Sequence, residues 1–285
     1  MGNVKKWIFI LICLFYNTFA FAQFSFENNR YYYWSDAGGE WYFEFNNSEF
    51  VLYDFSLTEK NQVPLPGYEG DMTAVLVKGR YIIEHSNNFK YLIVDDHQYL
   101  IIDDGDKYCF LYELNDKHIA YYGVNQKYIT SRKKVPVFIT PEFDHFIQFS
   151  SALSGSSRDG IRYRPPFSRI SYDSLWAFDI SHEKNQWIAF KDFTNTDTII
   201  IFNGMIYPKN MDYYKYNARA KNIVISYNGN KQVETLKDSP YPQIIKLKVP
   251  PGGERTIRID INDYYEGTRF SDAVISFIGF IGVNF

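Results

Sequence analysis

The sequence predicts an all-β protein in two parts: an N-terminal antiparallel meander or small barrel, followed by a jelly-roll β-sandwich. Aromatic residues make up 19% of the 285 residues, with 25 Tyr and 25 Phe, and these residue types favour pleated sheets. Short apolar runs also recur at even spacing between turn residues, and the N-terminal half shows no sustained helical period. This pattern is typical of antiparallel strands that close into barrels or stack into sandwiches.

The first 22 residues have the pattern of a signal peptide. Lys5 and Lys6 are basic, residues 7–16 are apolar, and an Ala-Phe-Ala sequence ends at Ala22. The apolar run is too short to cross a bilayer, which takes about 20 residues. We therefore expect cleavage before Gln23 and an extracytoplasmic protein, either secreted or periplasmic, of the bacterial envelope.

The two cysteines of the chain provide no disulfide after this cleavage. Cys13 follows Ile12 within the apolar run, whereas a lipoprotein signal needs a small residue there, so lipidation is not expected. Cys109 would be the single remaining thiol. Stability must then come from hydrophobic cores, for which the 46% hydrophobic content is sufficient.

The formal net charge of −3 gives the chain no long-range attraction for nucleic acid or for an acidic membrane. We therefore expect no nucleic-acid partner, and we expect a protein that does not span a membrane. The length allows one large domain or two of ordinary size, at about 100–200 residues each.

Residues 23–128 are predicted to form the N-terminal all-β domain. Turn-forming Asn and Asp pairs, such as Asn87-Asn88 and Asp104-Gly105, separate its candidate strands. These strands are Arg30–Trp34, Trp41–Phe45, Phe50–Phe55, Thr73–Glu84, Tyr91–Val94, Tyr99–Ile102, Tyr108–Glu113 and His118–Tyr122.

A linker is predicted at residues 129–145, because the polar, basic stretch 131–134 is followed by Pro136 and Pro141. Residues 146–285 then form the C-terminal domain, and we expect the two domains to fold separately. Thr198–Phe202 is a continuous apolar run, which predicts a strand buried on both faces. The further candidate strands are Ile223–Tyr227, Ile244–Val249, Thr256–Ile261 and Ala273–Phe285.

The long loop between Phe202 and Ile223 is the candidate binding site. Tyrosine rings in an end loop provide flat faces that stack on sugars, and charged neighbours bind hydroxyl groups. The alternative is that some of these rings plug the open end of the sandwich. The candidate ligand-binding residues are Tyr207, Lys209, Asp212, Tyr213, Tyr214 and Tyr216.

Two stretches, 202–227 and 257–280, resemble the NADase-type glycan-binding domain, a discoidin-like, galactose-binding-like β-sandwich related to F5/8 type C domains. The resemblance covers residues 146–285, about half of the chain. It implies the sandwich fold, an extracytoplasmic location and glycan binding, and it does not imply NADase activity. The chain departs from the pattern at Phe277, where the family tends to have an acidic residue. The matching positions are Asn203, Gly204, Tyr214, Asn217, Arg219, Lys221, Tyr265, Gly267, Asp272, Ile275 and Ser276.

Asn217 and Arg219 allow two interpretations. They are two residues apart and so face the same side of an extended chain. Either the two residues bind a ligand carboxylate, for which the planar guanidinium group of Arg219 is suited, or, as we favour, Arg219 ties the loop to the sheet edge by pairing with a residue such as Asp272.

Metal binding and catalysis find less support in the sequence, and we expect no cofactor. Residues 103–106 hold three Asp around a Gly, which offers Ca²⁺ ligands but equally predicts a hairpin turn. Asp260, Asp263 and Glu266 provide carboxylates for glycoside hydrolysis, although strand alternation turns Asp260 and Asp263 to opposite faces. The histidines have no metal-ligand spacing; they are His85, His97, His118, His145 and His182.

Three functions remain open on the sequence. The first, which we favour, is a non-catalytic binding protein that recognises a glycan or cell-surface component through the end loops of the C-terminal sandwich. The second is a structural or interaction protein of the envelope that docks another protein. The third is a glycan hydrolase.

Overall fold

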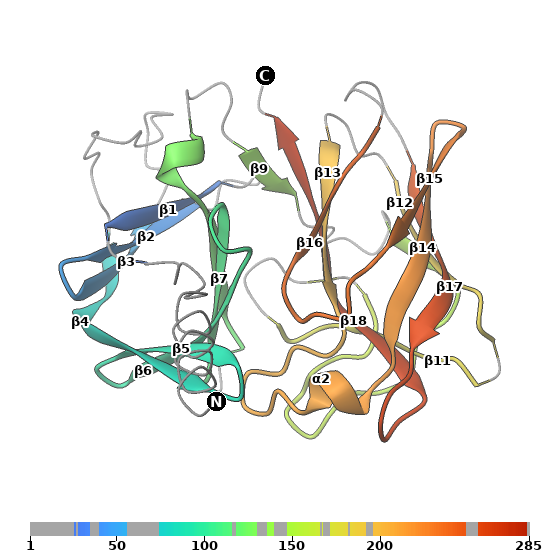
Figure 1. Cartoon of the computed structure of the whole chain (residues 1–285), viewed down its shortest axis with the longest axis horizontal. Helices are drawn as coiled ribbons and strands as arrows, with labels where there is room; N and C mark the ends of the chain where they lie inside the picture. The colour runs from blue at the N-terminus through green and yellow to red at the C-terminus, as the bar shows by residue number, and fades with distance from the viewer. Residues whose placement is uncertain are drawn as a thin grey trace, which may run out of the picture.

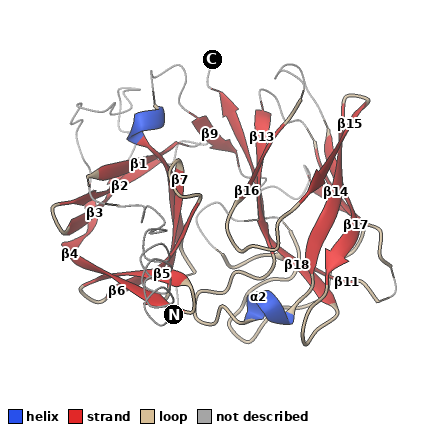
Figure 2. Ribbon diagram, viewed as in Figure 1, coloured by secondary structure: helices blue, strands red, loops and turns tan. Residues whose placement is uncertain are grey.

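The computed structural model shows an N-terminal β-barrel beside a C-terminal β-sandwich, with few helical residues (Figures 1 and 2). The predicted all-β class and its two parts are confirmed. The structure describes residues 26, 28–34, 40–55, 74–115, 118–129, 136–139, 147–165, 167, 172–181, 183–191, 196–248 and 256–283. The predicted signal peptide and the basic stretch 131–134 lie outside these residues.

The predicted meander is a closed antiparallel barrel in which each strand pairs with the next, and β1 pairs with β8 through Tyr31↔Asn125 and Tyr32↔Val124. Closure removes the free edges that an open sheet would expose. Aromatic side chains fill the inside, including Phe43, Phe45 and Phe50, each fully buried. The strands are β1 (Asn29–Trp34), β2 (Glu40–Asn46), β3 (Glu49–Phe55), β4 (Ala74–Ser86), β5 (Phe89–Val94), β6 (His97–Asp103), β7 (Tyr108–Glu113) and β8 (Ala120–Asn125).

The hairpin turns of the barrel lie where Asn and Asp predict them. Asn87 and Asn88, between β4 and β5, have φ of 50° and 67°. Asn47 and Ser48, between β2 and β3, have φ of 44° and 70°. Positive φ at both central residues defines the two-residue turn whose twist matches antiparallel strands. A short 3₁₀ helix, η1 (Gln126–Tyr128), follows β8.

The C-terminal part is a sandwich of two antiparallel sheets. One has the order β10-β12-β17-β14-β15, and the other has the order β11-β18-β13-β16 with β9 also paired to β18. Alternate side chains from both sheets fill a common core, in which Trp176, Phe178 and Phe190 are fully buried. The strands are β9 (Pro136–Ile139), β10 (Ile147–Phe149), β11 (Trp176–Asp179), β12 (Gln186–Phe190), β13 (Thr196–Asn203), β14 (Arg219–Tyr227), β15 (Asn230–Thr235), β16 (Gln243–Lys246), β17 (Ile257–Tyr265) and β18 (Asp272–Val283).

β13 explains why the run Thr198–Phe202 is apolar at consecutive positions. Ile199 and Ile201 pack into the core of the sandwich, whereas Ile200 and Phe202 belong to the cluster that fills the barrel. The predicted burial on both faces is therefore confirmed, and the barrel itself covers the second face.

The barrel and the sandwich share an aromatic contact surface. The Phe202 ring lies 4.6 Å from that of Phe110 and the Phe277 ring 6.2 Å from that of Tyr122, centroid to centroid. Tyr172 donates its backbone N–H to the carbonyl of His118 at 2.7 Å. β9 also lies within the predicted linker 129–145 and pairs with β18. From these contacts we expect the barrel and the sandwich to unfold together, whereas the sequence predicted two domains that fold separately.

Within the described part of the chain, no helix is both long enough and apolar enough to cross a membrane. The one α-helix described, α2 (Tyr213–Tyr216), is a single turn in the loop between β13 and β14.

Candidate functional site

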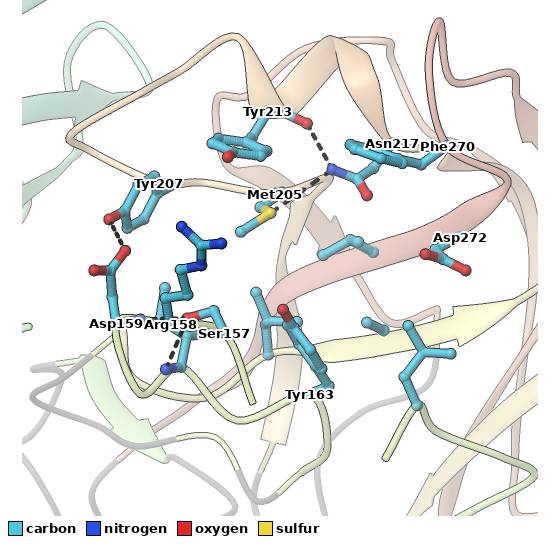
Figure 3. Close-up of a pocket in the computed structure, with 15 residues that line it drawn as sticks. Ser157, Arg158, Asp159, Tyr163, Met205, Tyr207, Tyr213, Asn217, Phe270 and Asp272 are labelled. Atoms are coloured by element: carbon cyan, nitrogen blue, oxygen red, sulfur yellow. Dashed lines mark hydrogen bonds between the residues drawn. The ribbon is translucent and has the colours of Figure 1, made fainter. Parts of the chain in front are cut away.

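A cavity of about 460 Å³ lies on the outer face of the sheet that contains β11 and β18 (Figure 3). Ala177 of β11 and Val274 of β18 are directly opposite each other and form part of its floor. Their neighbours Trp176 and Ile275 point the other way, into the sandwich core, as strand alternation requires. The walls come from two segments far apart in sequence, residues 153–163 and 205–217.

The loop wall of the cavity provides rings and a fixed amide. The rings of Tyr207 and Tyr213 meet edge to face with centroids 5.8 Å apart. Asn217 donates through Nδ2 to the Tyr213 carbonyl at 2.9 Å and approaches the Met205 sulfur at 3.7 Å. Because Asn217 is buried, its bond to Tyr213 fixes the turn of α2 against the cavity.

A tight turn forms the opposite wall. Ser157 accepts at Oγ from the backbone N–H groups of Asp159 and Ile161, each at 3.2 Å. Gly155 and Gly160 flank the turn with φ of 85° and 82°, a region that glycine enters without strain. The turn is joined to the loop wall because the Tyr207 hydroxyl donates to the Asp159 carboxylate.

Asp272 and Tyr163 give the cavity its electrostatic character at the β18 side. Burial raises the pKa of Asp272, and the charge of Asp179 raises it further. The two carboxylates belong to directly opposed residues of β11 and β18. Burial also raises the pKa of Tyr163, with contributions from Asp272 and Tyr213. Tyr163 is therefore a neutral phenol at pH 7 and can both donate and accept a hydrogen bond.

The structure brings two of the predicted ligand-binding residues into the cavity and leaves three others outside its lining. Tyr207 and Tyr213 line it. Lys209 and Asp212 lie exposed on the same loop. Tyr216 is half-buried, and its ring meets that of Tyr213 edge to face at 5.7 Å.

Tyr214, the remaining predicted residue, faces the protein interior. Its side chain is 2% exposed and packs in the cluster shared with the barrel. Its hydroxyl donates to Asp238 at 3.0 Å, and Arg219 lies over its ring at 5.4 Å. Gly204 lies so close that a Cβ there would be 2.6 Å from the ring. The alternative interpretation, in which a tyrosine ring is buried as a plug, therefore describes Tyr214.

Arg219 holds the loop, but the suggested pairing with Asp272 was wrong. Its guanidinium group, whose side chain is 5% exposed, bonds Asp238 through Nε at 3.0 Å and Nη2 at 2.9 Å. Nη1 donates to the carbonyls of Asn217 and Glu266 at 2.7 and 2.9 Å. Burial alone would raise the pKa of Asp238, but the hydrogen bonds from Arg219, Lys215 and Tyr214 lower it overall. These contacts support the structural interpretation of Arg219 that the sequence favoured.

Several cavity residues were missed by the sequence analysis. The 157–163 turn has no motif, and only the folding of β11 beside β18 brings it opposite the 205–217 loop. Asn217 was considered as a ligand contact together with Arg219, and Asp272 as a partner of Arg219. The residues not foreseen as binding residues include Arg158, Asp159, Tyr163 and Phe270.

Asp103 and Asp104, which were considered as Ca²⁺ ligands, instead make contacts in and beside the turn between β6 and β7. Asp103 pairs with Lys90 at 3.1 Å. Asp104 accepts at Oδ1 from the backbone N–H groups of residues 106, 107 and 108. Within the described residues, no group of three or more His, Cys, Asp or Glu side chains is placed to hold a metal ion.

The carboxylates considered for hydrolysis have cationic neighbours in β17 and β14. Asp260 pairs with Arg258 at 2.6 Å, and Asp263 pairs with Lys221 at 3.0 Å. Each carboxylate is thus part of an ion pair on the sheet surface.

Comparison with protein families decides the identity of the sandwich. The family model of the NAD glycohydrolase translocation F5/8 type C domain matches residues 186–281. The C-terminal half contains a discoidin-like domain. The match covers strands of the sandwich, and its description names a translocation domain. It leaves the chemistry of the barrel unassigned.

Two solved structures align with about half of this chain. The family 32 CBM of C. perfringens NanJ, solved in complex with galactose, is 11% identical, with 51% of this chain and 99% of that chain covered and a TM-score of 0.31. An F5/8 type C domain from Bacteroides fragilis is 11% identical, with 54% of this chain and 100% of that chain covered and a TM-score of 0.33. The comparison with curated proteins gave no match. The assignment of the discoidin-like domain therefore rests on the family match.

Positions that carried the resemblance mostly build the frame of the discoidin-like domain. Asn203 is fully buried and bonds both the N–H and the carbonyl of Ala220, at 2.9 and 2.7 Å. Gly204 adopts φ of 89°, beside Tyr214. Arg219 fixes the loop through Asp238. The residues that define the cavity wall at 157–163 lie outside this set.

Proposed function

We propose that the protein is an extracytoplasmic, non-catalytic binding protein that recognises a carbohydrate in the cavity of its discoidin-like domain. The observation that carries the proposal is the composition of this cavity: three tyrosines line it together with Phe270, Asn217 and charged side chains. Protein sites for sugars combine flat apolar faces with a few fixed polar groups. Ligand pockets usually have volumes of about 300–1,000 Å³, a range that includes this cavity. The F5/8 type C match and the signal-peptide pattern of residues 1–22 support the binding role and the location.

The test is a glycan array probed with the full chain, followed by calorimetric titration of the glycans that bind. Tyr213→Ala should weaken binding about ten-fold, because a ring lost at a ligand contact costs about 1–2 kcal/mol. The thermal midpoint should change little, since Tyr213 is only half-buried. Tyr128→Ala is the matched control, because Tyr128 is 38% exposed on the barrel. Equal loss of affinity in both variants, or unfolding of Tyr213→Ala at unchanged affinity, would contradict the proposal.

A second candidate, docking of another envelope protein, is favoured by one observation. β4 exposes three large apolar side chains along its length, Ile82 at 63%, Val75 at 50% and Leu76 at 43%, and exposed apolar surface is a feature of interaction sites. Ile82→Lys should abolish co-purification of a partner from envelope extracts and leave glycan binding unchanged. An unaltered set of co-purified proteins would speak against this candidate.

A further inference from the structure

One cation reaches into the cavity without a partner among the residues that the structure describes. Arg158 lines the cavity, and Figure 3 shows its side chain extending from the 157–159 turn toward the rings of Tyr207 and Tyr213. Its guanidinium group forms no hydrogen bond or ion pair with any residue that the structure describes. Four other arginines have carboxylate partners: Arg30 with Glu44, Arg162 with Asp173, Arg219 with Asp238, and Arg258 with Asp260.

Neither carboxylate of the cavity, Asp159 or Asp272, forms an ion pair with Arg158. Asp159 accepts the Tyr207 hydroxyl. Asp272 belongs to β18, and Figure 3 shows it on the far side of the cavity from Arg158. The 157–159 turn therefore presents guanidinium donors beside the Asp159 carboxylate, and the β18 end presents acceptor groups.

This separation of groups fits a particular class of sugar. A free guanidinium group provides two parallel N–H donors, which match the two oxygens of a carboxylate. Asp272 accepts hydrogen bonds from hydroxyl groups, Tyr163 and Asn217 offer further polar atoms, and the tyrosine rings cover the apolar face of a sugar ring. A neutral sugar offers Arg158 only hydroxyl and ring oxygens, which lack the charge and the paired geometry of a carboxylate.

We propose that the cavity selects an acidic sugar of the uronic acid class, with Arg158 binding its carboxylate. The inference rests on the proposed carbohydrate binding and adds the chemical class of the ligand. Arg158 is then the residue that determines specificity, and the rings determine that a sugar binds.

The test uses the full chain and an array that contains neutral glycans beside their uronic acid counterparts, for example oligomers of galactose and of galacturonic acid. The acidic member of a pair should bind about ten-fold to one-hundred-fold more tightly, as expected for hydrogen bonds to a charged group. Arg158→Ala should remove this preference, so that the acidic and the neutral member of each pair bind with similar affinity. The preference should also fall at high salt, because exposed charges are screened.

Arg164→Ala is the matched control, since Arg164 is exposed nearby but lies over the Phe149 ring outside the cavity lining. It should keep the preference. If neutral glycans bind as tightly as acidic ones, or if Arg158→Ala keeps the preference, the inference is overturned and carbohydrate binding stands. If no glycan of either kind binds, both proposals fail.

Discussion

Replacing Asp238 with alanine should destabilise the protein by about 3 kcal/mol, because it leaves the guanidinium group of Arg219 buried without a counter-charge. Arg219 has a 5% exposed side chain and Asp238 a 29% exposed one, so the loss should lie near the low end of the range for buried pairs. Three groups lose their bond to the carboxylate at once: Arg219, Lys215 and the Tyr214 hydroxyl. For a unit of this size the thermal midpoint should fall by about 6–12 °C.

Urea unfolding at pH 7 measures this loss, with Lys215→Ala as the control. The Lys215 side chain is 56% exposed, so its removal should cost less than about 1 kcal/mol. Adding Arg219→Met to Asp238→Ala should recover part of the lost stability, because no buried charge then lacks a partner. A double variant less stable than Asp238→Ala, or an Asp238→Ala variant no weaker than the control, would refute the reasoning.

The same pair gives a dependence on pH. The folded-state pKa of Asp238 is lowered from 3.8, so its contribution is fully present above the unfolded-state value and is lost as pH falls through the folded-state value. The difference in unfolding free energy between the wild type and Asp238→Asn should therefore be constant near neutral pH. It should shrink only in acid, below 3.8.

Three further changes have defined outcomes. Phe202→Ala should cost about 3–5 kcal/mol and lower the midpoint of a single calorimetric transition, since Phe202 joins the barrel and sandwich cores; two separate transitions in the wild type would show independent units. Gly204→Ala should destabilise the fold in urea titration, because φ is 89° and the new Cβ would meet the Tyr214 ring at 2.6 Å; unchanged stability would show that the ring moves freely. Asp179→Asn should stabilise by about 0.2–1 kcal/mol at pH 7, since it relieves the raised pKa of Asp272; the gain should vanish in acid, where Asp272 is protonated in both states.

The strands were predictable from this sequence because the residue patterns that favour a strand or a turn lie within a few neighbouring positions. β13 was evident from its continuous apolar run, and the barrel turns were evident from Asn and Asp pairs such as Asn87-Asn88. What a strand packs against is not local, and the sequence did not show that the barrel covers Ile200 and Phe202. Phe277, where the chain departs from the family pattern, lies at this same surface, beside Tyr122.

The candidate site was predictable only on one of its walls. A loop rich in tyrosine attracts notice in any sequence, but nothing distinguishes Tyr213, which lines the cavity, from Tyr214, which is buried. Adjacent residues of a helical turn point in different directions, and a single turn such as α2 is too short for a periodic pattern. The opposite wall, with Arg158, depends on contacts between segments about 50 residues apart, which composition does not encode.

The position of the loop between two packed surfaces connects the barrel to the cavity. On one side of the loop, Tyr207 and Tyr213 face the cavity. On the other, Ile206 and Met211 are buried in the cluster that fills the barrel. Interiors packed at this density transmit displacement, because side chains have no free volume into which to move. Ile206 is adjacent to Tyr207 in the chain, and Met211 is two residues from Tyr213. A change of packing in the barrel would therefore move these tyrosines, and the barrel is part of the structural support of the cavity wall.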